Sequence, residues 1–291
     1  MDIGRIGIWT AALDHQPAAR AQEAAAEIEA LGYGALWFPE AMGREAFTNA
    51  AVLLAGTRRL TIATGIANIW VRDAAAMAAA QKTLAEAYPD RFLLGMGVSH
   101  APLVGMRGHD YAKPFSAMQR YLDGMDQAPF LALGPTEAPP RALAALAPKM
   151  LRLSAERTWG SHTYFVPPEH TAQARAALGP DALLAPEQAV VLATDATTAR
   201  TIARGHMAMY LALPNYVNNL KRLGFSDDDV ANGGSDRLVD AIVVWGSVDD
   251  VATRVRAHHD AGANHVCLQV LDADPRALPM AGWRELAGLL A

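Results

Sequence analysis

The chain has 291 residues, of which 52% are hydrophobic, with 30 acidic and 25 basic side chains and a formal net charge of −5. A single cysteine excludes a disulfide framework and a zinc site built on several thiolates. The acidic balance argues against nucleic acid as a partner, because phosphate binding requires a basic face. The sequence contains no run of 18 apolar residues and no signal-peptide pattern, so we expect no membrane segment and a cytoplasmic location.

Short apolar runs alternate with amphipathic helical stretches along the first half of the chain. Pro17 is suited to a first helical turn and Gly32 to a helix end. The predicted strands are 6–9, 35–38, 60–64 and 92–96, and the predicted helices are 17–31, 47–55, 73–88 and 114–125. Apolar strands that alternate with helices indicate a parallel sheet covered by helices.

The second half repeats this pattern less regularly. The predicted strands are 141–145, 161–165, 188–192 and 265–270, and the predicted helices are 148–157, 169–178, 199–212 and 248–261. The alanines of 141–145 fit a helix equally well. Residues 127–140 contain four prolines and indicate a surface loop, and 213–237 read as an insertion of helix and loop.

Eight strand–helix units favour a (β/α)8 barrel of the TIM type over an open doubly wound sheet. The G-x-G-x-x-G loop of dinucleotide-binding folds is also absent after the first strand. We therefore predict one α/β barrel domain over residues 1–291, with a late insertion at about 213–237.

In such barrels the reactive groups lie where the strands end, in the loops that follow them. The strand ends carry aromatic and few charged residues, namely Trp9, Trp70, His162 and Tyr164. A mouth lined by these side chains suits a flat heterocycle and a small-molecule substrate better than a sugar phosphate. No motif of metal ligands is present, and we expect no metal site.

Two titratable residues follow strands directly and are the candidates for proton transfer. His100 comes after the run 92–98, and an imidazole titrates near neutral pH; the alternative is a loop histidine that bonds the backbone. Glu40 follows Trp37-Phe38-Pro39, where it can accept a proton or anchor a ring amide; the alternative is a solvated acid at a helix start.

An anionic group could be held at two places. Pro148 begins a helix, and the free N–H groups of the first turn can bind a phosphate. Arg107 and Lys113 lie in the loop 101–113 and can meet an anionic tail, although a solvated surface explains them as well. His258 and His259 are expected at the surface of a helix.

Several motifs resemble the luciferase-like monooxygenase family. They are IGIW at 6–9, LGYGALW at 31–37 and ATGIAN at 63–68. AEAYPDRF at 85–92, followed by LGMG at 94–97, resembles the branch that depends on the deazaflavin coenzyme F420, in its actinobacterial type. AALAPKM at 144–150 and DAGANHV at 260–266 extend the resemblance to nearly the whole chain.

The resemblance implies a homodimeric barrel that binds F420, or alternatively FMN, at the carboxyl ends of the strands. It implies a non-prolyl cis peptide at Gly65–Ile66 beneath the ring. His100 matches a catalytic acid/base glutamate of the branch, and Glu40 matches an aspartate that contacts the cofactor. The implied cofactor-binding residues are Glu40, Gly65, Ile66, Asn68, Ser99, Leu146, Ala147, Lys149 and Met150.

Three positions depart from the family pattern. Ala41 stands where the sugar-phosphate dehydrogenases of the branch have a histidine base, and Ala147 replaces a glycine, which requires a negative φ there. Trp159 stands where related sequences commonly have an aspartate. The main hypothesis is an F420-dependent oxidoreductase that moves a hydride between the cofactor's C5 and a small organic substrate. The alternatives are an FMN-dependent monooxygenase that receives reduced flavin from a separate reductase, and a non-catalytic cofactor-binding protein, which the loss of the histidine keeps open. An F420 reductase or a flavin reductase is the candidate protein partner.

Overall fold

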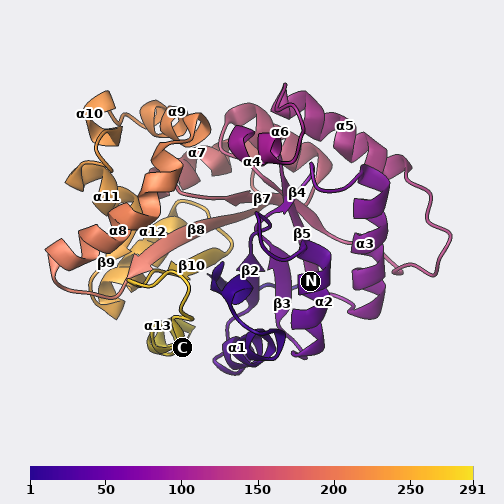
Figure 1. Cartoon of the computed structure of the whole chain (residues 1–291), viewed down its shortest axis with the longest axis horizontal. Coiled ribbons are helices and arrows are strands. Elements are labelled where there is room, and N and C mark those ends of the chain that lie inside the picture. Colours follow the sequence, from indigo (N-terminus) through magenta and orange to yellow (C-terminus); the bar gives the residue numbers. More distant parts are fainter. Residues whose placement is uncertain (291) are drawn as a thin grey trace.

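The computed structural model describes residues 1–290, and eight of its strands close into a parallel barrel (Figure 1). The barrel strands are β1 (Ile6–Trp9), β2 (Ala35–Phe38), β3 (Thr61–Thr64), β5 (Phe92–Gly97), β6 (Arg141–Ala144), β7 (Gly160–Thr163), β8 (Leu183–Val191) and β10 (Val266–Val270). Pairing of β10 with both β1 and β8 closes the ring. Two short strands are added to it, β4 (Ala67–Asn68) beside β5 and β9 (Val243–Trp245) beside β8. The predicted fold class is confirmed.

Helices surround the barrel and cover its outer face. They are α1 (Ala18–Ala30), α2 (Ala46–Ala55), α3 (Ala74–Ala87), α5 (Pro114–Gln127), α6 (Pro148–Arg157), α7 (Pro168–Leu178), α8 (Ala196–Leu211) and α12 (Val248–Asp260). Shorter helices occupy the loops, namely η1 (Ala12–His15), α4 (Ala101–Met106), α9 (Pro214–Arg222), α10 (Asp227–Val230), α11 (Asp236–Ile242), α13 (Met280–Leu286) and η2 (Ala287–Leu290). In the described part of the chain, no helix combines the length and the apolar character that crossing a bilayer requires.

Most element boundaries agree with the predictions within a few residues, and three differences are informative. The ambiguous run 141–145 is a strand, because Arg141–Ala144 pairs with β5 on one side and β7 on the other. β8 begins at Leu183, five residues before the predicted 188, because its first residues pair with β7 and its later ones with β10 and β9. The insertion 213–237 contains α9, α10 and the start of α11, so it is more ordered than predicted.

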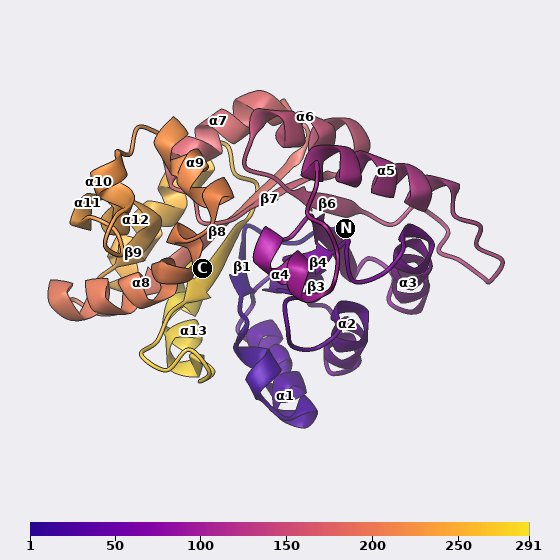
Figure 2. The same ribbon diagram turned by 45° about the horizontal axis from the view of Figure 1, so that its top comes forward.

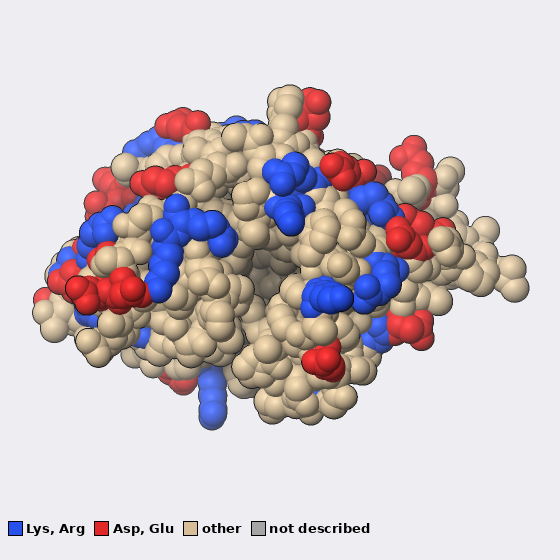
Figure 3. All heavy atoms as spheres, turned by 90° about the horizontal axis from the view of Figure 1, so that it is seen from above, with Lys and Arg blue, Asp and Glu red and all other residues tan. Residues whose placement is uncertain are grey.

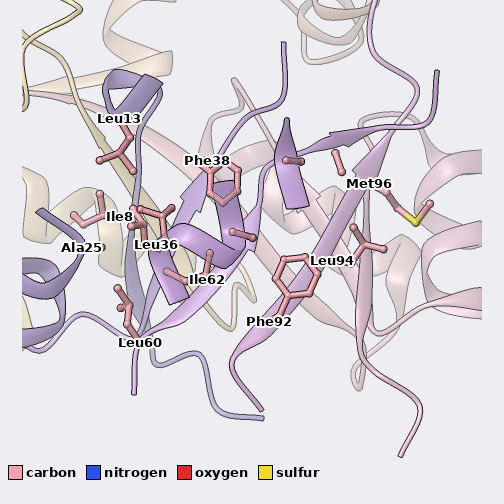
Figure 4. Packing of buried hydrophobic residues seen from close by; sticks show 14 of the residues in the cluster. Ile8, Leu13, Ala25, Leu36, Phe38, Leu60, Ile62, Phe92, Leu94 and Met96 are labelled. Atoms are coloured by element: carbon pink, nitrogen blue, oxygen red, sulfur yellow. The ribbon is translucent and has the colours of Figure 1, made fainter. Parts of the chain in front are cut away.

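Alternate residues of each strand face opposite sides of the barrel wall. Ile8, Leu36 and Ile62 are fully buried and pack outward against helix residues such as Ala25 (Figure 4). Trp9, Trp37 and Ala63 belong to a separate cluster inside the barrel. Burial of apolar surface contributes about 25 cal/mol per Å². The outer layer therefore holds the helices on the barrel and leaves the interior free to carry the site.

His258 is buried between α7, α12 and β8, which corrects the expectation that it lies at the surface. Its Nδ1 lies 2.8 Å from Thr171 Oγ1 and its Nε2 lies 2.9 Å from Gln188 Oε1. The helix is amphipathic, but His258 falls on its inner face, where two polar partners satisfy the ring. Burial lowers the pKa of His258 to about 3. Burial also lowers the pKa of His162, His206 and His265 to about 4.

These four histidines predict a fold that loses stability in mild acid. The unfolded chain protonates them below about pH 6.5, whereas the folded chain keeps them neutral down to about pH 4, so the stabilisation present above pH 6.5 is lost as the pH falls. Between about pH 6.5 and pH 4, each of these histidines lowers the free energy of unfolding by about 1.4 kcal/mol for each unit by which the pH falls. We expect the melting temperature to fall steeply from pH 7 to pH 5, and H258N to show a shallower slope. The exposed His15 provides the control, since H15N is expected to keep the wild-type slope, and equal slopes in all three proteins would contradict this account.

Candidate active site

The carboxyl ends of the strands surround a hollow that is visible on one face of the molecule (Figure 3). The loops on this side of the barrel carry α4 and α9 (Figure 2). The two helices meet through their side chains, because the ring of His100, which precedes α4, lies 5.4 Å from the ring of Tyr216 in α9. Lysine and arginine side chains lie at several points around the hollow, whose walls are mostly uncharged.

The peptide bond between Gly65 and Ile66 is cis, as the resemblance implied. Three hydrogen bonds, from the ends of two neighbouring strands, fix the backbone here. Gly65 N donates to Phe38 O (2.7 Å), Glu40 N donates to Ile66 O (3.1 Å), and Trp9 Nε1 donates to Gly65 O (3.2 Å). The bulge between β3 and β4 is therefore held by β1 and β2, and the half-buried Ile66 lies at its tip.

The wall of the barrel on this side lacks large side chains. A Cβ at Gly65 would lie 2.7 Å from Trp9 Nε1, and one at Gly97 would lie 2.9 Å from Ile66 Cγ1 and 3.1 Å from Ala144 Cβ. Contacts this short are not tolerated, so both positions require glycine. Ile66 packs into the space above Gly97 beside Ala144, and both Ile66 and Ala144 remain partly exposed.

Glu40 is a buried anchor that joins three loops. Its carboxylate forms a two-point ion pair with Arg72, whose Nη1 donates to Oε2 at 3.0 Å, and it accepts hydrogen bonds from Ala46 N (3.0 Å) and Asn68 N (2.8 Å). The Glu40 side chain is 2% exposed and that of Arg72 is 11% exposed. Because four donors already occupy its oxygens, Glu40 is better suited to hold the loops than to accept a proton.

Asn68 and Trp70 complete the loop after the bulge. Asn68 is 1% exposed, and its Oδ1 accepts from Trp70 N at 3.0 Å. Trp70 Nε1 donates to Val98 O at 3.0 Å, which ties this loop to the end of β5. Trp70 remains half-buried, whereas Asn68 is enclosed and supports the loop from below.

His100 lies at the end of β5, where it was predicted. The preceding Ser99 adopts a left-handed backbone with φ of +57°, and Tyr111 Oη donates to its carbonyl at 3.2 Å. Burial lowers the pKa of His100 below its ordinary value of 6.5, and a hydrogen bond with Asn215 partly offsets this effect. No protein group among residues 1–290 reaches its buried Nδ1. His100 is thus a half-buried imidazole with one ring nitrogen, the buried Nδ1, that no described protein group binds.

The opposite wall is aromatic and polar. Tyr164 packs against Trp9 with ring centroids 5.1 Å apart, and its hydroxyl lies 2.8 Å from both Tyr210 Oη and Gln269 Oε1. His162 lies deeper, stacked on Trp37 at 4.7 Å and 1% exposed, with Nδ1 2.8 Å from Ala185 O. Tyr164 is therefore half-buried just after β7, and the predicted pocket residue His162 lies deeper in the barrel.

The turn before α6 approaches the hollow from β6. Ala147 has φ of −95°, so the alanine that replaces the family's glycine is accommodated without strain. The half-buried Leu146 has its carbonyl fixed by His170 Nε2 at 3.0 Å, and Lys149 is exposed in the first turn of α6. Met150 is half-buried and packs on the core.

The structure thus brings most predicted residues to one end of the barrel, and it adds four that sequence reasoning missed. Those four are Arg72, Glu187, Tyr210 and Gln269. Gln269 and Glu187 occupy inward-facing positions of β10 and β8. The alternation of inward and outward residues along these strands could therefore have indicated them. Arg72 and Tyr210 lie in a loop and in a helix of other segments, and no local pattern points to them.

A second cavity, of about 620 Å³, opens at the amino-terminal end of the barrel. Gly4, Ile6, Gly34 and Leu289 line it, together with Arg5, Arg256 and His259. None of the predicted site residues borders it. The chemistry inferred from the strand ends therefore belongs to the opposite end of the barrel.

A profile of the luciferase-like monooxygenase family matches residues 5–265. The match spans most of the chain, so the chain belongs to the luciferase-like monooxygenase family, and it is an enzyme of the oxidoreductase type found there. A protein of Mycobacterium tuberculosis (strain ATCC 25618 / H37Rv), provisionally named a coenzyme F420-dependent oxidoreductase, is 31% identical over 120 residues. This match covers 41% of the chain and 33% of the relative, so the chain aligns with about a third of that protein's length.

Solved structures with the same fold cover both cofactor types. An F420-dependent secondary alcohol dehydrogenase, in complex with an F420–acetone adduct, has a TM-score of 0.79 at 15% identity, over 99% of this chain and 98% of that one. The F420-dependent tetrahydromethanopterin reductase of Methanopyrus kandleri has a TM-score of 0.77 at 16% identity, with the same coverage. The FMN-bound oxygenating constituent of 3,6-diketocamphane monooxygenase of Pseudomonas putida has a TM-score of 0.71 at 15% identity, covering 98% and 96%.

The anchoring role of Glu40 predicts a large effect of its removal on stability. E40Q leaves the buried Arg72 without its main counter-charge, and breaking a buried pair costs about 3 kcal/mol or more. Glu45 pairs with the same guanidinium at 2.7 Å but is 43% exposed, so E45Q is expected to cost less than about 1 kcal/mol. Chemical denaturation of both variants measures the difference, and equal losses would contradict the assignment.

Proposed function

We propose that this enzyme is an F420-dependent oxidoreductase that moves a hydride between the deazaflavin C5 and a small organic substrate. The observation that carries the proposal is the bulge between β3 and β4, where Ile66 packs over Gly97 beside Ala144 and no bulky side chain lies next to it. Small residues at this wall leave room for a planar ring at the carboxyl ends of the strands, where one face of the molecule is hollowed. The F420-dependent relatives in sequence and in fold support the same cofactor.

The residues present fit such a group. Ile66 would back the ring, and the turn at Leu146 and Ala147 would lie along the chain attached to it. In the first turn of α6, Met150 N and Leu151 N donate to Ala147 O, so the N–H and the exposed side chain of Lys149 are the groups that suit an anionic tail. Arg107 is also exposed, although it donates to Ala41 O at 2.7 Å. When bound, the deazaflavin would supply a carbon that gives or accepts a hydride and reacts poorly with oxygen.

His100 would handle the proton that accompanies the hydride. Burial keeps its imidazole neutral at pH 7, so it can accept the hydroxyl proton of an alcohol that is being oxidised. In the reverse direction the protonated ring would return that proton to the carbonyl oxygen. Glu40, with four donors on its carboxylate, would act as a positioning residue for the bulge rather than as a second proton carrier.

A fluorescence titration of the purified protein with F420 and with FMN tests the cofactor. We expect F420 to bind at least about tenfold more tightly than FMN, because the ring surface and the basic rim together suit the larger anionic molecule. Tight FMN binding with oxygen uptake during turnover would instead favour the second candidate, a two-component monooxygenase, which the FMN-bound structural relative supports. If the protein binds neither F420 nor FMN, the F420-dependent and the FMN-dependent proposals are both overturned.

The role of His100 predicts a selective loss of turnover. H100A should lower kcat by about 100-fold or more while leaving the Kd for F420 within about threefold, because the imidazole moves a proton and does not hold the ring. Alcohol oxidation by the wild type should stay level near pH 7 and fall only below pH 6.5, because burial lowers the pKa of the His100 ring below that value. H100A should lose this acidic limb.

The neighbouring His109 provides the matched control. It is exposed on the same loop, with its ring 5.9 Å from that of Trp70. H109A is expected to keep both kcat and the acidic limb. Wild-type turnover in H100A, or the same loss in both variants, would remove His100 from the mechanism.

A further inference from the structure

We propose that the cavity at the amino-terminal end of the barrel is a second ligand site, which binds an organic anion with an apolar body. Its volume is about 620 Å³, and pockets that hold small molecules have volumes of about 300–1,000 Å³. None of the residues predicted for the cofactor site lines it. The two sites are therefore separate, at opposite ends of the same barrel.

Four segments that are distant in sequence build the walls of this cavity. They are residues 4–6 at the start of β1, 32–34 before β2, 252–259 of α12 and 288–290 of η2. Glycines supply part of the lining and leave it without side chains there, and most of the remaining lining is apolar. The apolar side chains are those of Ile6, Ala252, Val255, Leu289 and Leu290. The apolar body of a ligand would lie against this part of the wall.

Every titratable side chain in the lining is basic. Arg5, Arg256 and His259 border the cavity, and no acidic side chain of residues 1–290 does. Neither arginine takes part in an ion pair formed within residues 1–290. Arg256 Nη2 donates only to a neutral hydroxyl, Thr253 Oγ1, at 2.8 Å. The guanidinium groups therefore remain available to an incoming anion.

His259 adds an unsatisfied nitrogen at the same cavity. Its Nδ1 lies 3.0 Å from Ala263 O, and its Nε2 is buried without a protein partner in residues 1–290. Burial lowers the pKa of His259 and the bond to Ala263 opposes this, while the charge of Arg5 lowers the pKa and that of Asp260 raises it. The effect of Arg5 shows that its guanidinium acts on this ring. Buried polar atoms normally have a partner, so Nε2 also favours a bound group here.

This lining selects an amphipathic anion. A guanidinium is planar and matches a carboxylate or a phosphate with two parallel hydrogen bonds, so the head of the ligand would lie at Arg5 and Arg256. An uncharged ligand of the same shape would gain the apolar contacts alone. A cationic ligand would face two arginines with no acid in the lining to balance them.

Three probes that share one apolar body test the site, namely octanoate, octyl phosphate and the uncharged octanamide. Their Kd values are measured by isothermal titration calorimetry on the purified protein. We expect octanoate, octyl phosphate or both to bind at least about tenfold more tightly than octanamide. Equal or tighter binding of octanamide, or binding of none of the three, would overturn the proposal.

Substitutions in the lining show where the anion binds. R5Q/R256Q removes both charges from exposed positions and should weaken binding of the anion at least about tenfold. A252L fills the cavity without changing its charge and should have a similar effect. Arg152 is exposed on α6, away from the cavity, so R152Q is the matched control and should keep the wild-type Kd. Wild-type affinity in both the double variant and A252L would overturn the proposal.

Two rival explanations are tested in the same assay. The carboxylate at the end of the chain follows Leu290 by one residue, and a four-residue glycine–serine tail moves it away. We expect the tail to leave the Kd of the anion within about threefold, whereas a gain of about tenfold would assign the arginines to the chain's own end. Saturating F420 should also leave this Kd unchanged, and displacement of the anion by F420 would overturn the separate site.

Discussion

The site depends on an uneven distribution of side-chain volume at the carboxyl-terminal end of the barrel. On the side of β3, β5 and β6 the inward positions are glycine or alanine, and a Cβ at Gly65 or Gly97 would collide with Trp9 or Ile66. On the side of β7, β8, β10 and β1 the inward positions carry Tyr164, Glu187, Gln269 and Trp9. Parallel strands bring both sets to the same end of the barrel. This distribution of side-chain volume produces a wall of small residues on one side of the barrel and a wall of large, mostly aromatic residues on the other.

The second constraint is the buried pair of Glu40 and Arg72, which connects the ends of β2 and β4 and the start of α2. It lies next to the bulge and holds backbone groups whose positions set the shape of the ring surface. The exposed loops around it differ in character. Charges on the rim are solvated, whereas the interior keeps Glu187, His162 and His206 uncharged through burial. One end of the barrel thus offers charge at its edge and neutral, aromatic surface at depth.

Much of this arrangement could be predicted from the sequence, and the limits have physical causes. The alternation of apolar strands and helices predicted the barrel, and the strand ends placed His100 and Tyr164 correctly. The resemblance of ATGIAN to a family motif located the cis bond at Gly65–Ile66. Arg72 and Tyr210 were missed because they reach the site from segments distant in sequence, and His258 was misplaced because a polar residue on an amphipathic helix does not reveal its buried partners. The sequence did not indicate that β8 begins at Leu183, because Pro186 lies within the strand and because β8 pairs in turn with β7, β10 and β9.

The most direct measurement of the central claim is a crystal structure of the protein with F420 bound. The account predicts that the deazaflavin ring lies against Ile66 and Ala144, with C5 open toward His100 and the tyrosines, and with the anionic tail near the first turn of α6. A ring that instead stacks on Tyr164 and Tyr210, or that occupies the cavity at the amino-terminal end of the barrel, would contradict it.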